Sequence, residues 1–92
     1  MQIEQAEVIA VQALGWLAGN DDLMPVFLSA TGASADDLRT LAGAPDFLIS
    51  VLDFLAMDDA WIIAFCASAG LPNDAPLKAR NALPGGGQVH WT

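Results

Sequence analysis

Residues 45–70 read Pro-Asp-Phe-Leu-Ile-Ser-Val-Leu-Asp-Phe-Leu-Ala-Met-Asp-Asp-Ala-Trp-Ile-Ile-Ala-Phe-Cys-Ala-Ser-Ala-Gly. This stretch predicts two helices joined at Asp58-Asp59, because Pro45 suits the first turn of a helix and Gly70 is a typical helix stop. The second helix is apolar on nearly every side. Such a helix must be covered by its own fold, by a partner or by a membrane.

Length and charge exclude a membrane as that cover. The apolar runs at 47–57 and 60–69 are each shorter than the about 20 residues that a bilayer requires. Joining the two runs into one span would bury Asp53, Asp58 and Asp59. The chain also opens with acidic residues where a secretory signal needs positive charge, so we expect no signal peptide.

The composition predicts one acidic, cytoplasmic domain. Ninety-two residues are enough for a single domain with its own core. Eleven acidic residues against three basic ones give a net charge of -8, which argues against nucleic acid as a partner because phosphates need lysine and arginine clusters. A basic protein surface or a cation suits this charge better. Cys66 is the only cysteine, so no internal disulfide is possible and a reducing cytoplasm is expected.

Apolar spacing predicts about six helices in residues 1–84, followed by a glycine-rich tail at 85–92. Besides the two helices of 45–70, helices are expected from Ile3 to Ala18, between Asp22 and Gly32, between Ser34 and Gly43, and from Asn73 or Asp74 to Leu83. In the first, Val8, Val11 and Trp16 widen the apolar face, and Gly15 suggests close approach of another helix. Ser34 resembles the start of a capping box. The expected core of the second helix is Leu23, Val26, Phe27 and Ala30.

The chain matches itself at a shift of 38 residues, with Leu14–Asp21 lying over Leu52–Asp59. Phe27 then meets Phe65, and Gly32 meets Gly70. The matches fall on helix stops, caps and core aromatics. We therefore expect an all-α, compact bundle built from two similar three-helix halves, in which the 45–70 hairpin is the core and the first two helices cover it.

Several segments carry a family resemblance: Leu14–Ala18, Phe47-Leu48, Val51–Leu55, Ala82–Gly86 and the His90-Trp91 ending. They resemble a family of short, all-helical bacterial proteins of unknown function. The resemblance implies a helical fold and a bacterial cytoplasmic setting. It implies no activity, cofactor or catalytic residue.

The polar residues predict structural roles. The pairs Asp21-Asp22, Asp36-Asp37 and Asp58-Asp59 stand where helices begin and suit helix capping. Asp53 shares one helix face with Asp46 and Ser50, so it is either solvated or paired with Arg39 or Arg80. Cys66 lies in the most apolar helix and is expected to be inert. We predict no catalytic, cofactor-binding or metal-ligating residue.

These observations favour a non-catalytic protein-interaction module that contacts another protein or a second copy of itself. The expected partner contacts are Trp61, Ile62, Ile63, His90 and Trp91. The alternative is a protein that binds a small apolar ligand between Phe47, Phe54, Trp61 and Phe65. An enzyme ranks third. A helix-turn-helix at 22–43 is rejected because its second helix carries Asp36 and Asp37.

Overall fold

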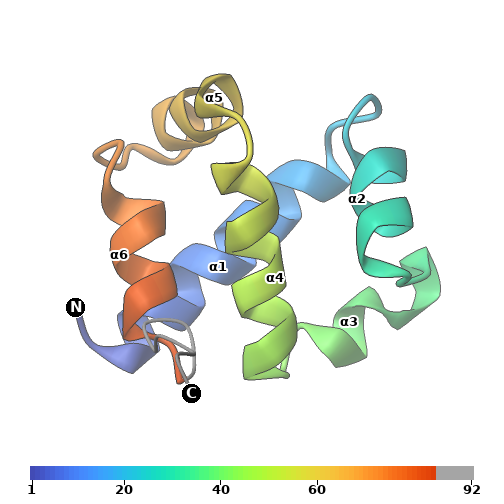
Figure 1. The fold of residues 1–92 in the computed structure, drawn as a ribbon, viewed down its shortest axis with the longest axis horizontal. Helices are drawn as coiled ribbons and strands as arrows, with labels where there is room; N and C mark the ends of the chain where they lie inside the picture. Colours follow the sequence, from blue (N-terminus) through green and yellow to red (C-terminus); the bar gives the residue numbers. More distant parts are fainter. Residues whose placement is uncertain (85–92) are drawn as a thin grey trace, which may run out of the picture.

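The computed structural model describes residues 1–84; the candidate contacts His90 and Trp91 lie outside the described residues. Residues 1–84 form α-helices and one 3-10 turn and contain no strand, which confirms the all-α prediction (Figure 1). The elements are α1 (Ile3–Ala18), α2 (Met24–Thr31), η1 (Ala35–Asp37), α3 (Leu38–Leu41), α4 (Pro45–Ala56), α5 (Asp59–Ala69) and α6 (Ala75–Ala82).

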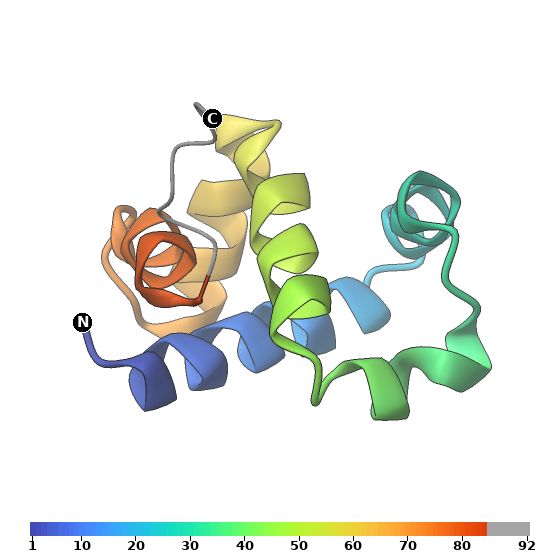
Figure 2. The ribbon, with the colours of Figure 1, turned by 60° about the horizontal axis from the view of Figure 1, so that its bottom comes forward.

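The core is built mainly by α1 and α4, so the predicted core hairpin is correct for α4 and less so for α5, which buries only Phe65 and Cys66. Figure 2 shows α1 running along one side of the molecule with α4 and α6 packed across it, and these are its most extensive contacts. Its buried residues recur every three or four positions, as one face of a helix requires. They are Ala6, Ile9, Ala10, Ala13, Leu14 and Leu17.

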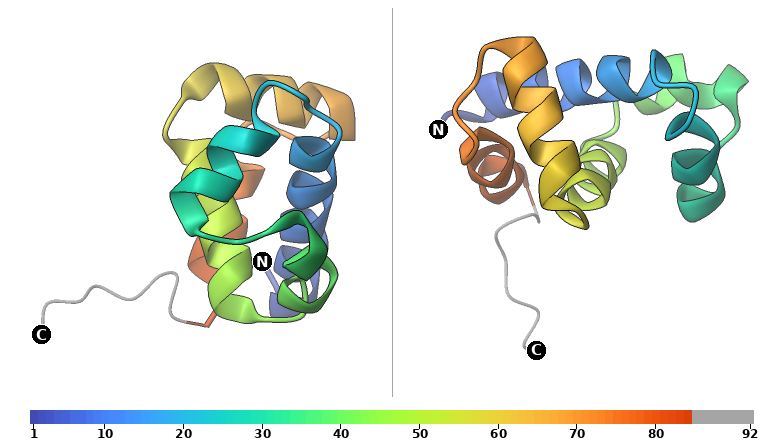
Figure 3. Two further views of the ribbon diagram at one scale, coloured as in Figure 1. Left: turned by 90° about the vertical axis from the view of Figure 1, so that its right-hand side faces the viewer. Right: turned by 90° about the horizontal axis from the view of Figure 1, so that it is seen from above.

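The arrangement of two similar halves is not confirmed. Seen from above, α5 lies over α4 and reaches α1, whereas α2 stands at the other end of the molecule (Figure 3). The local correspondences do hold. Gly32 and Gly70 both end a helix in the left-handed conformation, with φ of 75° and 71°, and Phe27 and Phe65 are both fully buried. A glycine helix stop and a buried phenylalanine therefore each occur twice, 38 residues apart.

Aromatic contacts attach the peripheral helices to the core. Phe27 of α2 meets Phe47 and Phe54 of α4 edge to face, with ring centroids 5.8 and 5.2 Å apart. Trp61 of α5 stacks on Phe54 at 4.9 Å. Phe27 is the only buried residue of α2, so the prediction that Val26 and Ala30 also belong to the core is wrong. The short helix turns a single side toward α4, and Val26 is 49% exposed.

The predicted caps are partly correct. Asp58 caps α5, because its Oδ1 accepts a hydrogen bond from the backbone N–H of Ala60 at 2.8 Å. No side chain caps α2; the side chain of Asn20 instead holds the turn before it, accepting from the N–H groups of Asp22 and Leu23. The capping box at Ser34 is wrong. Its hydroxyl donates to the carboxylate of Asp37 at 2.8 Å, so that the segment begins as a 3-10 turn.

Candidate interaction surfaces

Helix α5 is covered on only one side. Phe65 and Cys66 are its buried residues, Trp61 and Ile62 are half-buried, and Ile63 is 53% exposed. The exposed apolar side chains recur at i, i+3, i+4 and i+7 and therefore share one face, which we call the α5 outer face. It consists of Ala60, Ile63, Ala64 and Ala67.

A groove adjoins this face where α4, α5 and α6 meet. It has a volume of about 260 Å³, and its apolar lining includes Ile62 and Leu77, the latter 55% exposed. Asp59, Asp74 and Arg80 contribute polar atoms to the same groove. The arrangement of apolar residues beside charged ones is the usual composition of a protein contact surface.

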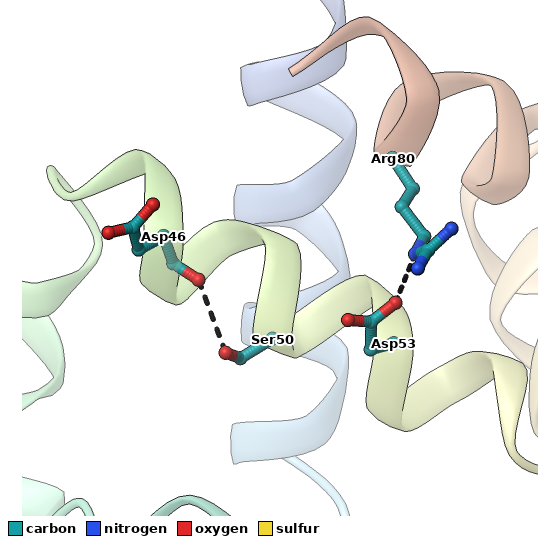
Figure 4. Close-up of polar contacts among 4 residues, drawn as sticks. All are labelled: Asp46, Ser50, Asp53 and Arg80. Carbon is teal, nitrogen blue, oxygen red and sulfur yellow. Dashed lines mark hydrogen bonds and ion pairs between the residues drawn. The ribbon is translucent and has the colours of Figure 1, made fainter. Parts of the chain in front are cut away.

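Asp53 lies on the exposed face of α4 and pairs there with Arg80 of α6 (Figure 4). Both of the alternatives that the sequence left open are thus partly correct, since the carboxylate is on the solvent side and is also paired. Ser50 donates a hydrogen bond to the backbone carbonyl of Asp46 on the same face, at 3.2 Å. A pair this exposed stabilises the fold by about 0–1 kcal/mol. Its role is to tie α6 to α4.

Cys66 is a poor nucleophile. Its side chain is only 1% exposed. Burial, and to a smaller extent the negative charge of Asp74, raise the pKa of the Cys66 thiol above its ordinary value of 9.0. Because the thiolate is the reactive form, the geometry assigns Cys66 to the core.

The four aromatic residues proposed as a ligand site share the hydrophobic core, but their ring contacts fall into two groups. Phe47 and Phe54 pack with Phe27, whereas Phe65 meets Trp16 of α1 edge to face at 6.1 Å. A groove of about 450 Å³ between α2 and α4 is lined by Phe47 and Phe54, together with Ala30, Thr31, Ser50, Asp53 and Met57. Trp61 and Phe65 do not line it.

A second apolar surface follows α1 and was missed in the sequence. Val8 and Val11 were assigned to a widened core face, but they are 56% and 44% exposed. They border a hollow of about 630 Å³ between α1 and the start of α4. A smaller hollow of about 290 Å³ continues it toward the end of α1 and shares Val11 and Ala42. The sequence does carry one sign of this surface. No charged residue occurs between Glu7 and Asp21, so the solvent-facing side of this part of α1 has to be uncharged.

The role suggested for Gly15, close approach of another helix of this chain, is wrong. Gly15 lies on the exposed side of α1, and no atom is within 4 Å of the place where a β-carbon would stand. Its backbone is helical. Nothing in residues 1–84 therefore requires glycine here.

Neither a metal-ion site nor a bilayer-crossing helix is found in residues 1–84. In this part of the chain, no group of three or more His, Cys, Asp or Glu side chains is placed to hold a metal ion. None of its helices combines the length and the apolar character that crossing a bilayer takes.

Comparison with curated proteins and with solved structures gives no match. A family model described as "Protein of unknown function (DUF3572)" matches residues 3–86, which is most of the chain and includes all six α-helices. The expectation of a family of short helical proteins without an assigned activity is confirmed by this match. The chain belongs to the DUF3572 family of proteins of unknown function.

Proposed function

We propose that this protein is a non-catalytic interaction module of the cytoplasm, which contacts another protein or a second copy of itself through the α5 outer face. The observation that carries the proposal is the incomplete cover of α5. This helix is apolar on nearly every side, yet Ile63 at its centre is 53% exposed and Trp61 and Ile62 are half-buried. Clustered exposed apolar residues mark contact surfaces in soluble proteins.

The polar side chains support a non-catalytic role. Asp58 is engaged as a helix cap, Asp53 pairs with Arg80, and Asp74 pairs with Lys78 at 3.0 Å. The pair of Asp53 and Arg80 joins α4 to α6, and the other two contacts stabilise the starts of α5 and α6. In residues 1–84 the one carboxylate that accepts a hydrogen bond from a hydroxyl is Asp37, and both it and its donor Ser34 are exposed in the turn before α3.

The experiment compares two substitutions of similar exposed residues. Ile63→Glu places a charge on the α5 outer face, and Val26→Glu places the same charge on α2, where Val26 is 49% exposed. We expect both variants to fold, as measured by circular dichroism. Affinity capture from an extract of the native host, with quantitative mass spectrometry, should recover partners with the wild type and with Val26→Glu, and at least tenfold less with Ile63→Glu.

Light scattering separates the two kinds of partner. If the partner is a second copy, the wild type and Val26→Glu are dimers and Ile63→Glu is a monomer. The proposal is refuted if all three proteins recover the same set from the extract and all remain monomeric up to millimolar concentration.

The groove between α2 and α4 supports a second candidate function, binding of a small apolar ligand. Its volume of about 450 Å³ is within the usual range for such sites, and Phe47 and Phe54 line it. Fatty acids of increasing chain length should then raise the melting temperature. Ala30→Trp, which fills the groove from its α2 side, should remove this effect. The absence of a thermal shift with any fatty acid would exclude the candidate.

A further inference from the structure

Two hollows lie end to end beside α1 and together make a trough. Val8, Val11, Gly15 and Ala18 supply one wall, and Ala42 and Leu48 contribute to the other. The hollows meet at Val11 and Ala42, which line both. From Glu4 to Ala18 the trough follows α1 for about four turns, which is roughly 21 Å at the rise of an α-helix. We call this surface the α1 trough.

The shape of the α1 trough suits a helix. Its walls include the small residues Gly15, Ala18, Ala42 and Gly43, beside which a second helix can approach closely. Gly15 destabilises α1 by about 1 kcal/mol relative to alanine. No contact among the described residues accounts for that cost, since a β-carbon at this position would meet nothing within 4 Å there. A glycine at this place leaves room for a molecule from outside.

The charges of the α1 trough select the kind of helix. Glu4 and Glu7 line one end, and Arg39 lines the other, so the walls carry two negative charges and one positive charge. The ion pairs found in residues 1–84 involve neither glutamate. Two of the three basic residues of the chain, Lys78 and Arg80, are already paired with aspartates on α6 and α4. A second copy would bring a like charge of -8 to this surface. A basic partner is attracted both by the nearby glutamates and by the net charge of the whole molecule.

We propose that the α1 trough binds a cationic amphipathic helix of a partner protein. The apolar side of that helix lies on Val8, Val11 and Leu48, with its backbone close to Gly15. Its lysine or arginine side chains lie beside Glu4 and Glu7. This site is separate from the α5 outer face, so the two proposals can fail independently.

The test uses designed peptides and fluorescence anisotropy. The probe is a labelled helical peptide of about 16 residues, with leucine and alanine on one face and lysine on the other, long enough for four turns. Its matched control has glutamate in place of every lysine. We expect the lysine peptide to bind at least tenfold more tightly than the glutamate peptide, and its affinity to fall between about 20 and 200 mM salt, because added salt screens exposed charges.

Variants locate the bound peptide. Gly15→Leu places a side chain in the trough, starting from a position where a β-carbon has open space, and should weaken binding of the lysine peptide at least tenfold. The double variant Glu4→Gln, Glu7→Gln should weaken binding and reduce its salt dependence. Ala67→Leu makes a similar small-to-large change on the α5 outer face and should leave binding unchanged, as should Ile63→Glu. Circular dichroism confirms that each variant is helical.

Three results would overturn the proposal. One is equal binding of the lysine peptide to the wild type and to Gly15→Leu. Another is equal binding of the lysine and glutamate peptides, which would show apolar adhesion without charge selection. The third is a wild-type dimer that Gly15→Leu converts to a monomer, which would assign the α1 trough to a second copy.

Discussion

Gly15 and Gly70 form a matched pair for substitution by alanine. At both positions a new β-carbon would have no atom within 4 Å, so neither change causes a clash. The backbones differ. Gly15 is part of α1, whereas Gly70 ends α5 with φ of 71°. The side-chain environment is therefore held constant, and only the backbone conformation distinguishes the two variants.

The two substitutions should have opposite effects on the free energy of unfolding. Alanine is favoured over glycine inside a helix by about 1 kcal/mol, so Gly15→Ala should stabilise the protein by about that amount. A side chain in the left-handed conformation costs about 1–2 kcal/mol, so Gly70→Ala should destabilise it. In a domain of this size 1 kcal/mol corresponds to roughly 4–8 °C in melting temperature. Urea unfolding followed by circular dichroism and tryptophan fluorescence measures both values.

A loss of stability in Gly15→Ala would contradict the reasoning, because it would mean that the new β-carbon clashes with another group. If the clashing group belongs to a second copy of the chain, the loss of stability will depend on protein concentration, so the measurement is repeated at low and high concentration. An unchanged stability in Gly70→Ala would show that α5 ends in a different conformation. The dependence of each unfolding free energy on urea should stay that of the wild type, since neither residue alters the surface exposed on unfolding.

Three further predictions concern single side chains. Phe27→Ala should lower the free energy of unfolding by about 3–5 kcal/mol in urea, because the ring is fully buried between two others of α4; a loss below about 1 kcal/mol would show that Phe27 does not anchor α2. Asp58→Ala should cost about 1 kcal/mol through the lost cap of α5, and Asp59→Ala less, since only Asp58 bonds to the helix start; equal losses would contradict the assignment. The pKa of Cys66 is raised in the folded state, so the native thiol keeps its proton while the unfolded thiol ionises above pH 9.0. Stability should therefore fall more steeply with rising pH above that value than in Cys66→Ala, and parallel pH profiles would exclude the raised pKa.

Local structure was largely predictable from the sequence. The periodicity of residues 3–18 and the stop at Gly19 give the observed bounds of α1, and Pro45 and Gly70 mark the start of α4 and the end of α5. The apolar spacing of α4 also predicts its buried side, which consists of Phe47, Leu48, Val51, Leu52, Phe54 and Leu55. These features depend on neighbours within one or two turns, which a sequence displays directly.

The packing was not predictable to the same extent, because it depends on residues far apart in the chain. Val8, Val11 and Val26 have the apolar character of core residues, yet they are about half exposed because no element of residues 1–84 packs over them. The pairing of Asp53 with Arg80 was one of two ion-pair alternatives, and only the position of α6 selects it over Arg39. The α1 trough was missed for the same reason, since apolar spacing does not tell a covered face from an open one.

The contact between α1 and α6 joins the first and the last helix described, and Met1 borders the same hollow as Lys78, Asn81 and Ala82. During synthesis on the ribosome α1 is therefore made long before the helix that covers much of its buried face. The part of this face that α6 covers stays open until residues 75–82 have left the exit tunnel, whereas α4 can cover its part earlier. Contacts between distant parts of a chain slow folding, so we expect the nascent chain to stay sensitive to proteases along α1 until α6 has docked.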